Sequence, residues 1–321
     1  MYKDFYGFSG KPFQLTPDLK FLFPTKGHKR AMSYMNYGLE QSEGFVVITG
    51  HIGTGKTMLI QKLLADLQDQ EIATARVAAA NLDADNVVST VAAALGQPHE
   101  GKSKVAILRH LEKSLLHARE YLRGVLLIVD EAQTLTPAAL EELRILSNLE
   151  SRGSALMQIF LVGQTELRET LKLSSQEQLR QRIIASYHLE PLTLDETKHY
   201  IGYRLVAVGW NGKPSLAPEV YDEVQEWTDG IPRKINMLMD RLLVYGYLEE
   251  VLAFEQEHIN AVIEEMSEEL AGDLVTPLSE RELPATGATP ESADVADRLA
   301  ALEKRLESLA TMPPDGKASN Q

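Results

Sequence analysis

The chain has 321 residues, 44% of them hydrophobic, and a formal net charge of -14. That length and composition allow a sizeable buried core and room for two domains. The lack of cysteine excludes disulfides, thiolate nucleophiles and cysteine-bound zinc. The negative charge argues against broad electrostatic binding of nucleic acid, although a local basic patch stays open.

Nothing in the sequence has the pattern of a membrane span. The longest apolar run, from Leu242 to Phe254, is interrupted by Glu249 and Glu250, and a span needs about 18 apolar residues. The first residues, Met-Tyr-Lys-Asp-Phe-Tyr, lack the basic-then-apolar pattern of a secretory signal. We therefore expect a cytoplasmic protein without a membrane span.

Residues 1–43 are expected to form an aromatic segment and a leading helix, both packed on the core. Up to residue 27, aromatic side chains are interleaved with Gly and Pro, which favours an irregular packed segment over a binding site. Residues 28–41 then carry apolar side chains at helical spacing and predict a helix.

Residues 44–191 alternate between strand-like and helical patterns. The apolar runs that we expect to be strands are 45–49, 72–78, 125–129, 156–162 and 184–189. The main helical patterns between them are 57–70, 103–123 and 136–149. This alternation predicts an α/β fold, with parallel strands joined by crossover helices and a sheet covered on both faces.

Past Pro191 the strand patterns stop, and residues 192–270 predict a small helical domain. Its expected helices are 193–208, 218–228, 231–248 and 255–270. Local chemistry marks several helix starts: an N-cap with proline at Thr136-Pro137, and capping boxes at Ser174–Glu177 and Thr193–Glu196.

The C-terminal residues divide into three predicted parts. Residues 271–293 have the composition of a linker, and residues 312–321 are expected to form a disordered tail. Between them, residues 294–311 predict a short amphipathic helix with leucines three or four residues apart. That helix fits either packing on the protein or association with a second copy or a partner helix.

The clearest motif is Gly50-x-x-x-x-Gly55-Lys56-Thr57, which lies between a predicted strand and a predicted helix. In this P-loop pattern, backbone N–H groups of the turn and of the helix start point at phosphate oxygens. We expect Lys56 to reach the β and γ phosphates of ATP and Thr57 to bind Mg²⁺. The expected nucleotide-binding residues are Gly50, His51, Ile52, Gly53, Thr54, Gly55, Lys56, Thr57 and Met58.

A second motif, Asp130-Glu131, ends the buried strand pattern of residues 125–129. Asp130 is expected to hold Mg²⁺, and Glu131 to polarise the attacking water as a general base. The weaker interpretation, in which one of the two carboxylates only caps the next turn, is disfavoured by the P-loop upstream.

Four further residues occupy positions that an ATP-dependent switch would use. Gln164, after an apolar run, is expected to sense the γ-phosphate or to position water. Arg180 and Arg182, before the last strand, fit either surface salt bridges or arginine fingers that reach a neighbouring subunit. Arg233, at the start of a helix in the small domain, is expected to touch the γ-phosphate and couple hydrolysis to domain closure.

Together these motifs resemble the AAA+ ATPases. The opening Phe5-Tyr-Gly-Phe, with Lys11-Pro-Phe and Pro17-Asp, is similar to the secretion ATPases related to the general secretion pathway A component. Lacking a membrane span and a peptidoglycan-binding domain, the chain resembles more closely the ATPases of exosortase and PEP-CTERM protein-sorting loci, which accompany exopolysaccharide production.

The resemblance implies a P-loop NTPase fold with a five-stranded parallel sheet in the order 5-1-4-3-2 and a helical lid. Gln164 departs from the Asn or Thr that is frequent at this sensor position. The implied activity is Mg²⁺-dependent ATP hydrolysis by a homo-oligomer, which powers or regulates an envelope protein-sorting or exopolysaccharide export system. The implied partners are envelope or export proteins, which could hold the chain at the inner membrane.

Three other functions stay open at this point. Transposition ATPases share this core, so a DNA-associated matchmaker is the main alternative, although the negative charge weighs against it. Asp130-Glu-Ala-Gln133 imitates a helicase motif, yet only one α/β core is predicted. A nucleotide-gated adaptor with little turnover would carry the same motifs.

Overall fold

The structure is a computed structural model that describes residues 2–274. Contacts divide the chain into two units, Met1–Ser267 and Glu268–Gln321. The first unit contains the sheet and every site discussed below. Within residues 2–274, no helix combines the length and the apolar character needed to cross a bilayer. The predicted helix at 294–311 and the tail at 312–321 lie outside the described residues.

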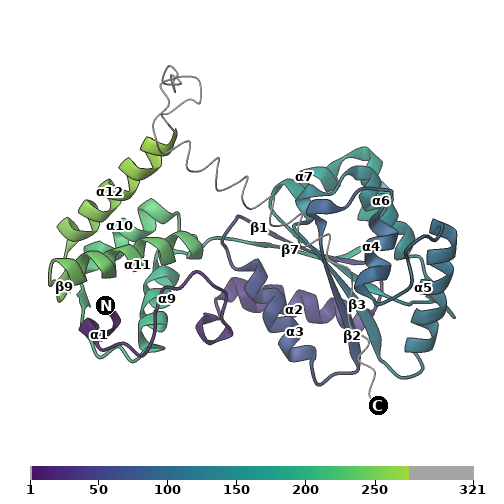
Figure 1. Cartoon of the computed structure of the whole chain (residues 1–321), viewed down its shortest axis with the longest axis horizontal. Coiled ribbons are helices and arrows are strands. Elements are labelled where there is room, and N and C mark those ends of the chain that lie inside the picture. The colour runs from purple at the N-terminus through teal and green to yellow at the C-terminus, as the bar shows by residue number, and fades with distance from the viewer. Residues whose placement is uncertain (1, 275–321) are drawn as a thin grey trace, which may run out of the picture. The chain divides into compact units, whose positions relative to one another are not determined.

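A five-stranded parallel sheet forms the centre of the α/β part (Figure 1). Its order is β2-β3-β6-β1-β7, which is the order 5-1-4-3-2 when these strands are numbered along the chain. The expected fold class is therefore confirmed. All residues of β1 and β6 are buried, as expected for central strands covered on both faces. The strands are β1 (Phe45–Gly50), β2 (Ile72–Ala78), β3 (Gly124–Asp130), β6 (Gln158–Gly163) and β7 (Ile183–Leu189).

Helices cover both faces of this sheet. Successive strand side chains point to opposite faces, so Val46 and Ile48 pack on one layer of helices while Val47 packs on the other. The first layer is α2 (Lys26–Gln41) and α3 (Lys56–Leu67), which Figure 1 shows together on one side of the sheet. The second layer is α4 (Val87–Ala94), α5 (Lys104–Ala118), α6 (Pro137–Leu146), α7 (Glu166–Lys172) and α8 (Glu177–Arg180).

Four helices after β7 form a separate hydrophobic cluster, which we call the lid. The capping box at its first helix is confirmed: Thr193 Oγ1 accepts from Glu196 N at 3.3 Å, and Glu196 Oε2 accepts from Thr193 N at 3.2 Å. The last helix continues four residues past its predicted end, into the predicted linker. The lid elements are α9 (Leu194–Val206), α10 (Pro218–Thr228), α11 (Pro232–Leu248), α12 (Gln256–Leu274), and the two-residue strands β8 (Ser215–Leu216) and β9 (Ala253–Phe254).

The aromatic N-terminal segment packs on the lid, which corrects the expectation that it packs on the α/β core. Its buried side chains belong to the lid cluster, and Tyr6 OH donates to Val251 O at 3.0 Å. The segment is partly regular, with α1 (Tyr2–Tyr6) and the 3-10 turn η1 (Leu19–Phe21). We call residues 12–25 the strap, because they connect the part packed on the lid to α2, which packs on the sheet.

Other differences from the predicted elements are local. The capping box predicted at Ser174–Glu177 is wrong: Ser174–Gln176 is a 3-10 turn (η4), and α8 begins at Glu177 without a side-chain cap. The N-cap predicted at Thr136 is confirmed, since Thr136 Oγ1 accepts from Ala139 N at 3.1 Å. Neither α4 nor α7 was predicted, and the remaining short elements are β4 (Glu150–Ser151), β5 (Ser154–Ala155), η2 (Ala79–Asn81) and η3 (Ala132–Thr134).

Candidate nucleotide-binding site

The P-loop turns sharply between β1 and α3. Gly53 and Gly55 have φ of +84° and +103°, values that residues with a Cβ rarely adopt. Gly55 is also the N-cap of α3 and has no side chain that could accept from the first turn. The N–H groups at the start of α3 therefore stay available for an anion, where the helix dipole also favours negative charge.

Lys56 lies over this loop. Its ammonium donates to Gly50 O at 2.7 Å and to His51 O at 2.8 Å. An ammonium has three N–H donors, so one remains for a phosphate oxygen. Burial lowers the pKa of Lys56, and the nearby carboxylates of Glu131 and Asp130 oppose that shift.

The two carboxylates after β3 are held differently. Asp130 is buried; its Oδ1 accepts from Glu131 N at 2.9 Å, and its Oδ2 pairs with Arg76 of β2. Glu131 has a φ of +56°, which is uncommon for a residue with a side chain. Sequence reasoning missed Arg76, because no local pattern connects it to a carboxylate 54 residues away.

Gln133 joins Glu131 to Gln164. Its Nε2 donates to Glu131 Oε2 at 2.6 Å, and its Oε1 accepts from Gln164 N at 2.9 Å. One side-chain amide thus fixes both the carboxylate expected to act as a base and the backbone of the expected sensor. The sequence contained this residue within Asp130-Glu-Ala-Gln133, but its role in holding the other two needed the structure.

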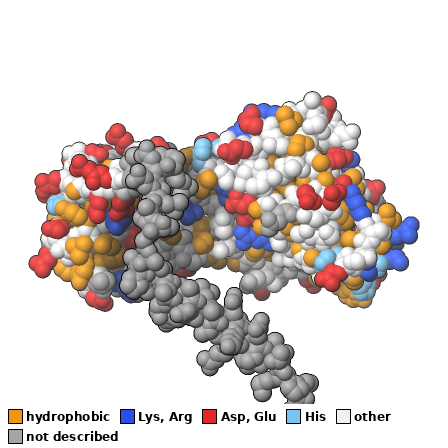
Figure 2. Space-filling model, turned by 45° about the horizontal axis from the view of Figure 1, so that its top comes forward, with side chains coloured by type: hydrophobic (Ala, Val, Ile, Leu, Met, Phe, Trp, Pro, Cys, Tyr) orange, Lys and Arg blue, Asp and Glu red, His pale blue; other side chains and the backbone are white. Residues whose placement is uncertain are grey.

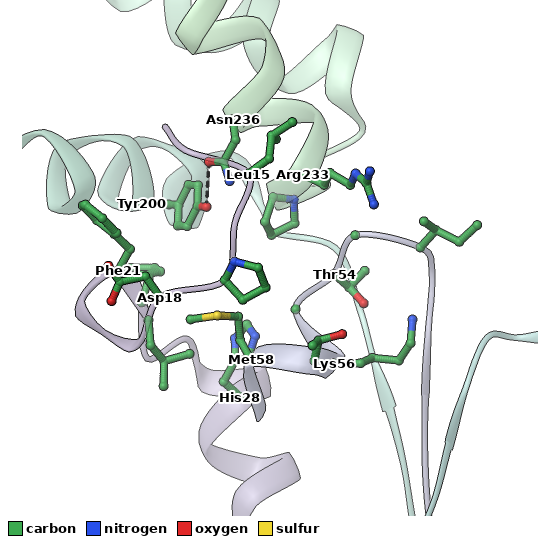
Figure 3. A pocket seen from close by; sticks show the side chains of 18 of the residues that line it. Leu15, Asp18, Phe21, His28, Thr54, Lys56, Met58, Tyr200, Arg233 and Asn236 are labelled. Carbon is green, nitrogen blue, oxygen red and sulfur yellow. Dashed lines mark hydrogen bonds between the residues drawn. The ribbon is translucent and has the colours of Figure 1, made fainter. Parts of the chain in front are cut away.

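The expected site residues gather at one cavity of about 400 Å³. Arg233 reaches it from the start of α11, where Arg233 N donates to Gly53 O at 3.2 Å, so the lid touches the P-loop directly. Figure 3 shows Arg233 of the lid facing Thr54 and Lys56 of the P-loop. The expected residues that line the cavity are Ile52, Gly53, Thr54, Gly55, Lys56, Thr57, Met58, Asp130, Glu131, Gln164 and Arg233.

Four expected residues lie elsewhere. Gly50 ends β1 beneath the loop, and His51 lines a second hollow beside Ile52. Arg180 Nη1 donates to Leu171 O at 2.7 Å and to Leu173 O at 2.6 Å, at the end of α7. Among the described residues, Arg182 Nη1 contacts Ser147 alone, at the long distances of 3.4 and 3.5 Å. Neither arginine lines the cavity of its own chain.

The other end of the cavity is formed by the strap and the lid, which sequence reasoning did not assign to the site. From the lid come Leu192, Tyr200, Arg204, Pro232 and Asn236, and from the strap Gln14–Asp18 and Phe21–Phe23. This end carries apolar side chains next to a few polar groups, as is typical of pockets that bind an organic ring. The Pro-rich and aromatic pattern of residues 1–27 was the available signal.

His28, on the first turn of α2, connects the strap to the P-loop. Its Nδ1 lies 2.7 Å from Thr25 Oγ1, and a Cβ built on Gly55 would lie 2.7 Å from its Nε2. The ring is buried, and burial lowers its pKa against the opposing charge of Glu196 and a backbone hydrogen bond at Thr54.

The donor set also fits a Mg²⁺ ion. Thr57 and Asp130 both line the cavity and offer a hydroxyl and a carboxylate, the hard oxygen ligands that this ion prefers. The ion would share Asp130 with Arg76, which now pairs with that carboxylate. Among the described residues, no cluster of three or more His, Asp or Glu side chains forms an alternative metal site.

The chain has the fold and the phosphate loop of the P-loop NTPases. Residues 39–171 match the model of a family described as an AAA domain, so this part of the chain is similar to AAA domains. The chain is 35% identical over 248 residues to the general secretion pathway protein A of Aeromonas hydrophila. The match covers 77% of this chain and 45% of that protein, so the chain spans less than half the length of this relative.

Solved structures show the same fold at low sequence identity. Cdc6p from Pyrobaculum aerophilum is 18% identical with a TM-score of 0.60, and the match covers 82% of this chain and 75% of that one. The Aeropyrum pernix Orc1 protein, solved in complex with DNA, is 18% identical with a TM-score of 0.59. This match covers 95% of this chain and 84% of that one. Both likenesses concern the fold alone.

Proposed function

We propose that the chain binds ATP with Mg²⁺ and hydrolyses it. The observation that carries this proposal is the convergence on one cavity of Lys56 and Thr57 from α3, Asp130 and Glu131 from the end of β3, and Arg233 from the lid helix α11. Such a set supplies a cradle for phosphates, oxygen ligands for a metal ion and a carboxylate base, the parts that phosphoryl transfer to water requires.

Each residue has a distinct role in the proposed reaction. The N–H groups at the start of α3 and the third N–H of Lys56 bind the phosphates. Mg²⁺, held by Thr57 and Asp130, would neutralise phosphate charge when bound. Glu131, steadied by Gln133, accepts the proton of the attacking water, while Gln164 and Arg233 contact the γ-phosphate.

The test is release of phosphate from ATP by the purified chain with and without Mg²⁺. Glu131→Gln removes the base but leaves the cradle, so we expect ATP binding to persist while turnover falls about 100-fold or more. Lys56→Ala is expected to abolish binding as well. Turnover that survives in both variants would refute the proposed chemistry.

For the biological role, we propose an oligomeric ATPase that drives or regulates an export system of the cell envelope. Support comes from the likeness to general secretion pathway protein A. The finer assignment, to exosortase and PEP-CTERM sorting with exopolysaccharide export, rests on the resemblance of the motifs. In this proposal the chain works in the cytoplasm and meets the inner membrane through its partners.

DNA binding is the second candidate function. It is favoured by the helix α2, which exposes Lys26, Lys29 and Arg30 next to Tyr34 and Tyr37. Against it, the chain carries a net charge of -14, and on the face in Figure 2 the Lys and Arg side chains of the described residues form small groups among acidic ones.

One capture experiment separates the two roles. ATP-loaded Glu131→Gln protein is offered solubilised envelope proteins and duplex DNA together at physiological salt, with Lys56→Ala protein as the control. Recovery of export components without DNA supports the envelope role. Recovery of DNA that is lost as salt rises supports the alternative, because phosphate contacts weaken steeply with salt.

A further inference from the structure

Arg204 of α9 is a buried arginine without a carboxylate partner. Its side chain is 5% exposed, and no carboxylate of residues 2–274 forms an ion pair with it. Instead its Nε donates to Pro12 O at 2.6 Å and its Nη2 to Gln14 O at 3.3 Å, both in the strap. Its guanidinium lies 4.7 Å from the ring centroid of Phe21. A buried charge is costly, so all of its donors need fixed acceptors, and the strap is held in place as a result.

The third donor of Arg204 starts a hydrogen-bond chain with one direction. Its Nη1 lies 2.6 Å from Tyr200 OH, and that hydroxyl lies 2.8 Å from Asn236 Oδ1. Arginine can only donate, so the Tyr200 oxygen accepts and its proton goes to Asn236. Burial raises the pKa of Tyr200, so the phenol keeps this proton at neutral pH.

This direction leaves Asn236 as a donor. Because its Oδ1 accepts from Tyr200, the amide nitrogen is the group left over, and within residues 2–274 it has no acceptor of its own. Asn236 is 7% exposed and lines the cavity at the end formed by strap and lid. Figure 3 shows the Tyr200–Asn236 bond on the lid side of the cavity, with Thr54 and Lys56 on the P-loop side.

We infer that Asn236 reads the base of the bound nucleotide as a fixed hydrogen-bond donor, oriented by Arg204 through Tyr200. A fixed donor needs an acceptor opposite it, and in this assignment the base presents the edge that holds ring position 1 to Asn236. At ring position 1 adenine carries such an acceptor, whereas guanine carries an N–H donor that would face the amide without a partner. Asn236 is thereby the specificity-determining residue, and Tyr200 and Arg204 are positioning residues.

The inference rests on the proposed ATP site, and the test keeps the two apart. Affinities for ATP, GTP and inorganic tripolyphosphate are measured by competition against a fluorescent ATP analogue. Tripolyphosphate reports the phosphate end alone. If the unaltered chain binds none of the three, the proposed function fails. If it binds ATP, the variants decide the inference.

Two variants with nearly unchanged shape are used, since Arg204 variants could fail to fold. Asn236→Asp replaces the donor with an acceptor and is expected to weaken ATP binding at least about tenfold relative to tripolyphosphate. Tyr200→Phe releases the amide, so the ratio of ATP to GTP affinity is expected to fall toward one. Asn36→Asp, on the exposed face of α2, is the matched control and should change neither ratio.

Because an added carboxylate also repels phosphates, only the ratio of ATP to tripolyphosphate affinity is decisive for Asn236→Asp. An equal loss of affinity for ATP and for tripolyphosphate would overturn the inference, since it would show that the substitution acts through its charge or through folding. An ATP to GTP ratio that stays the same in Tyr200→Phe would overturn it as well.

Discussion

At the scale of single residues, Gly55 is where the backbone of the P-loop and the ring of His28 leave no room for a side chain. Its φ is +103°, and a Cβ would lie 2.7 Å from His28 Nε2. We expect Gly55→Ala to weaken ATP binding at least about tenfold and to lower the free energy of unfolding by about 1–3 kcal/mol, measured by titration and by denaturant unfolding.

Gly96 allows the cost of the backbone conformation to be separated from the cost of the contact with His28. It also has a positive φ, of +68°, but nothing lies within 4 Å of a Cβ built on it. In Gly96→Ala only the backbone conformation is unfavourable, so we expect the free energy of unfolding to fall by about 1 kcal/mol and ATP binding to stay unchanged. Equal losses of stability and of binding in both variants would contradict the role given to the contact with His28.

His28 makes the stability of the protein depend on pH in a defined direction. Burial lowers its pKa in the folded state, so the unfolded chain, with a pKa of about 6.5, binds more protons at mildly acidic pH. The contribution of the neutral ring to the free energy of unfolding is therefore fully present above about pH 6.5. It is lost as the pH falls toward the lowered pKa, by up to about 1.4 kcal/mol per pH unit.

The measurement is the free energy of unfolding between pH 5.5 and 7.5 for the unaltered chain and for His28→Gln. The difference between the two proteins is expected to shrink as the pH falls. His188, whose pKa is also lowered by burial, is common to both and cancels in that difference. A difference that does not change with pH would show that His28 does not titrate as expected.

At the scale of elements, the capping box at the start of α9 anchors the helix that carries Tyr200 and Arg204. Thr193→Ala removes the side-chain acceptor for Glu196 N and is expected to lower the free energy of unfolding by about 1 kcal/mol. Thr170→Ala, late in α7, is the control and should change it by less than about 0.5 kcal/mol. Denaturant unfolding of both variants checks this. An equal loss of unfolding free energy in the two would show that the side-chain cap does not stabilise α9.

The same scale shows how far the sequence could predict the site. The phosphate end was predictable, because its chemistry lies in two contiguous motifs at the ends of β1 and β3 whose positions follow from the strand pattern. The other end was not, because Asn236 is an ordinary polar residue within a helical pattern and gains its role only through Tyr200 and Arg204.

The N-terminal segment illustrates a second limit. Its aromatic residues indicated burial, yet they recur without a helical or strand period, so no face could be derived and no packing partner named. The lid cluster, formed by helices two hundred residues further along the chain, turned out to be that partner. Contacts over such a separation leave no signal in a single sequence.

At the scale of the whole molecule, the surroundings of Arg180 and Arg182 predict different roles for them in the proposed oligomer. Arg180 is bound by two carbonyls at the end of α7, which gives it a structural role. Within residues 2–274, the side chain of Arg182 has only long contacts, to Ser147, so we propose it as the arginine that reaches the ATP site of a neighbouring subunit. An arginine finger of this kind places one active site across two chains.

Mixing two inactive variants tests this arrangement. Lys56→Ala chains lack the phosphate lysine but keep Arg182, and Arg182→Ala chains lack the finger but keep the cradle. In a mixed oligomer, some interfaces pair an intact cradle with an intact finger, so phosphate release is expected to recover above that of either variant alone. Arg180→Ala, if its role is structural, should keep its own turnover and gain nothing from mixing. Absence of recovery in oligomers shown to contain both chains would mean that Arg182 acts within its own chain or not at all.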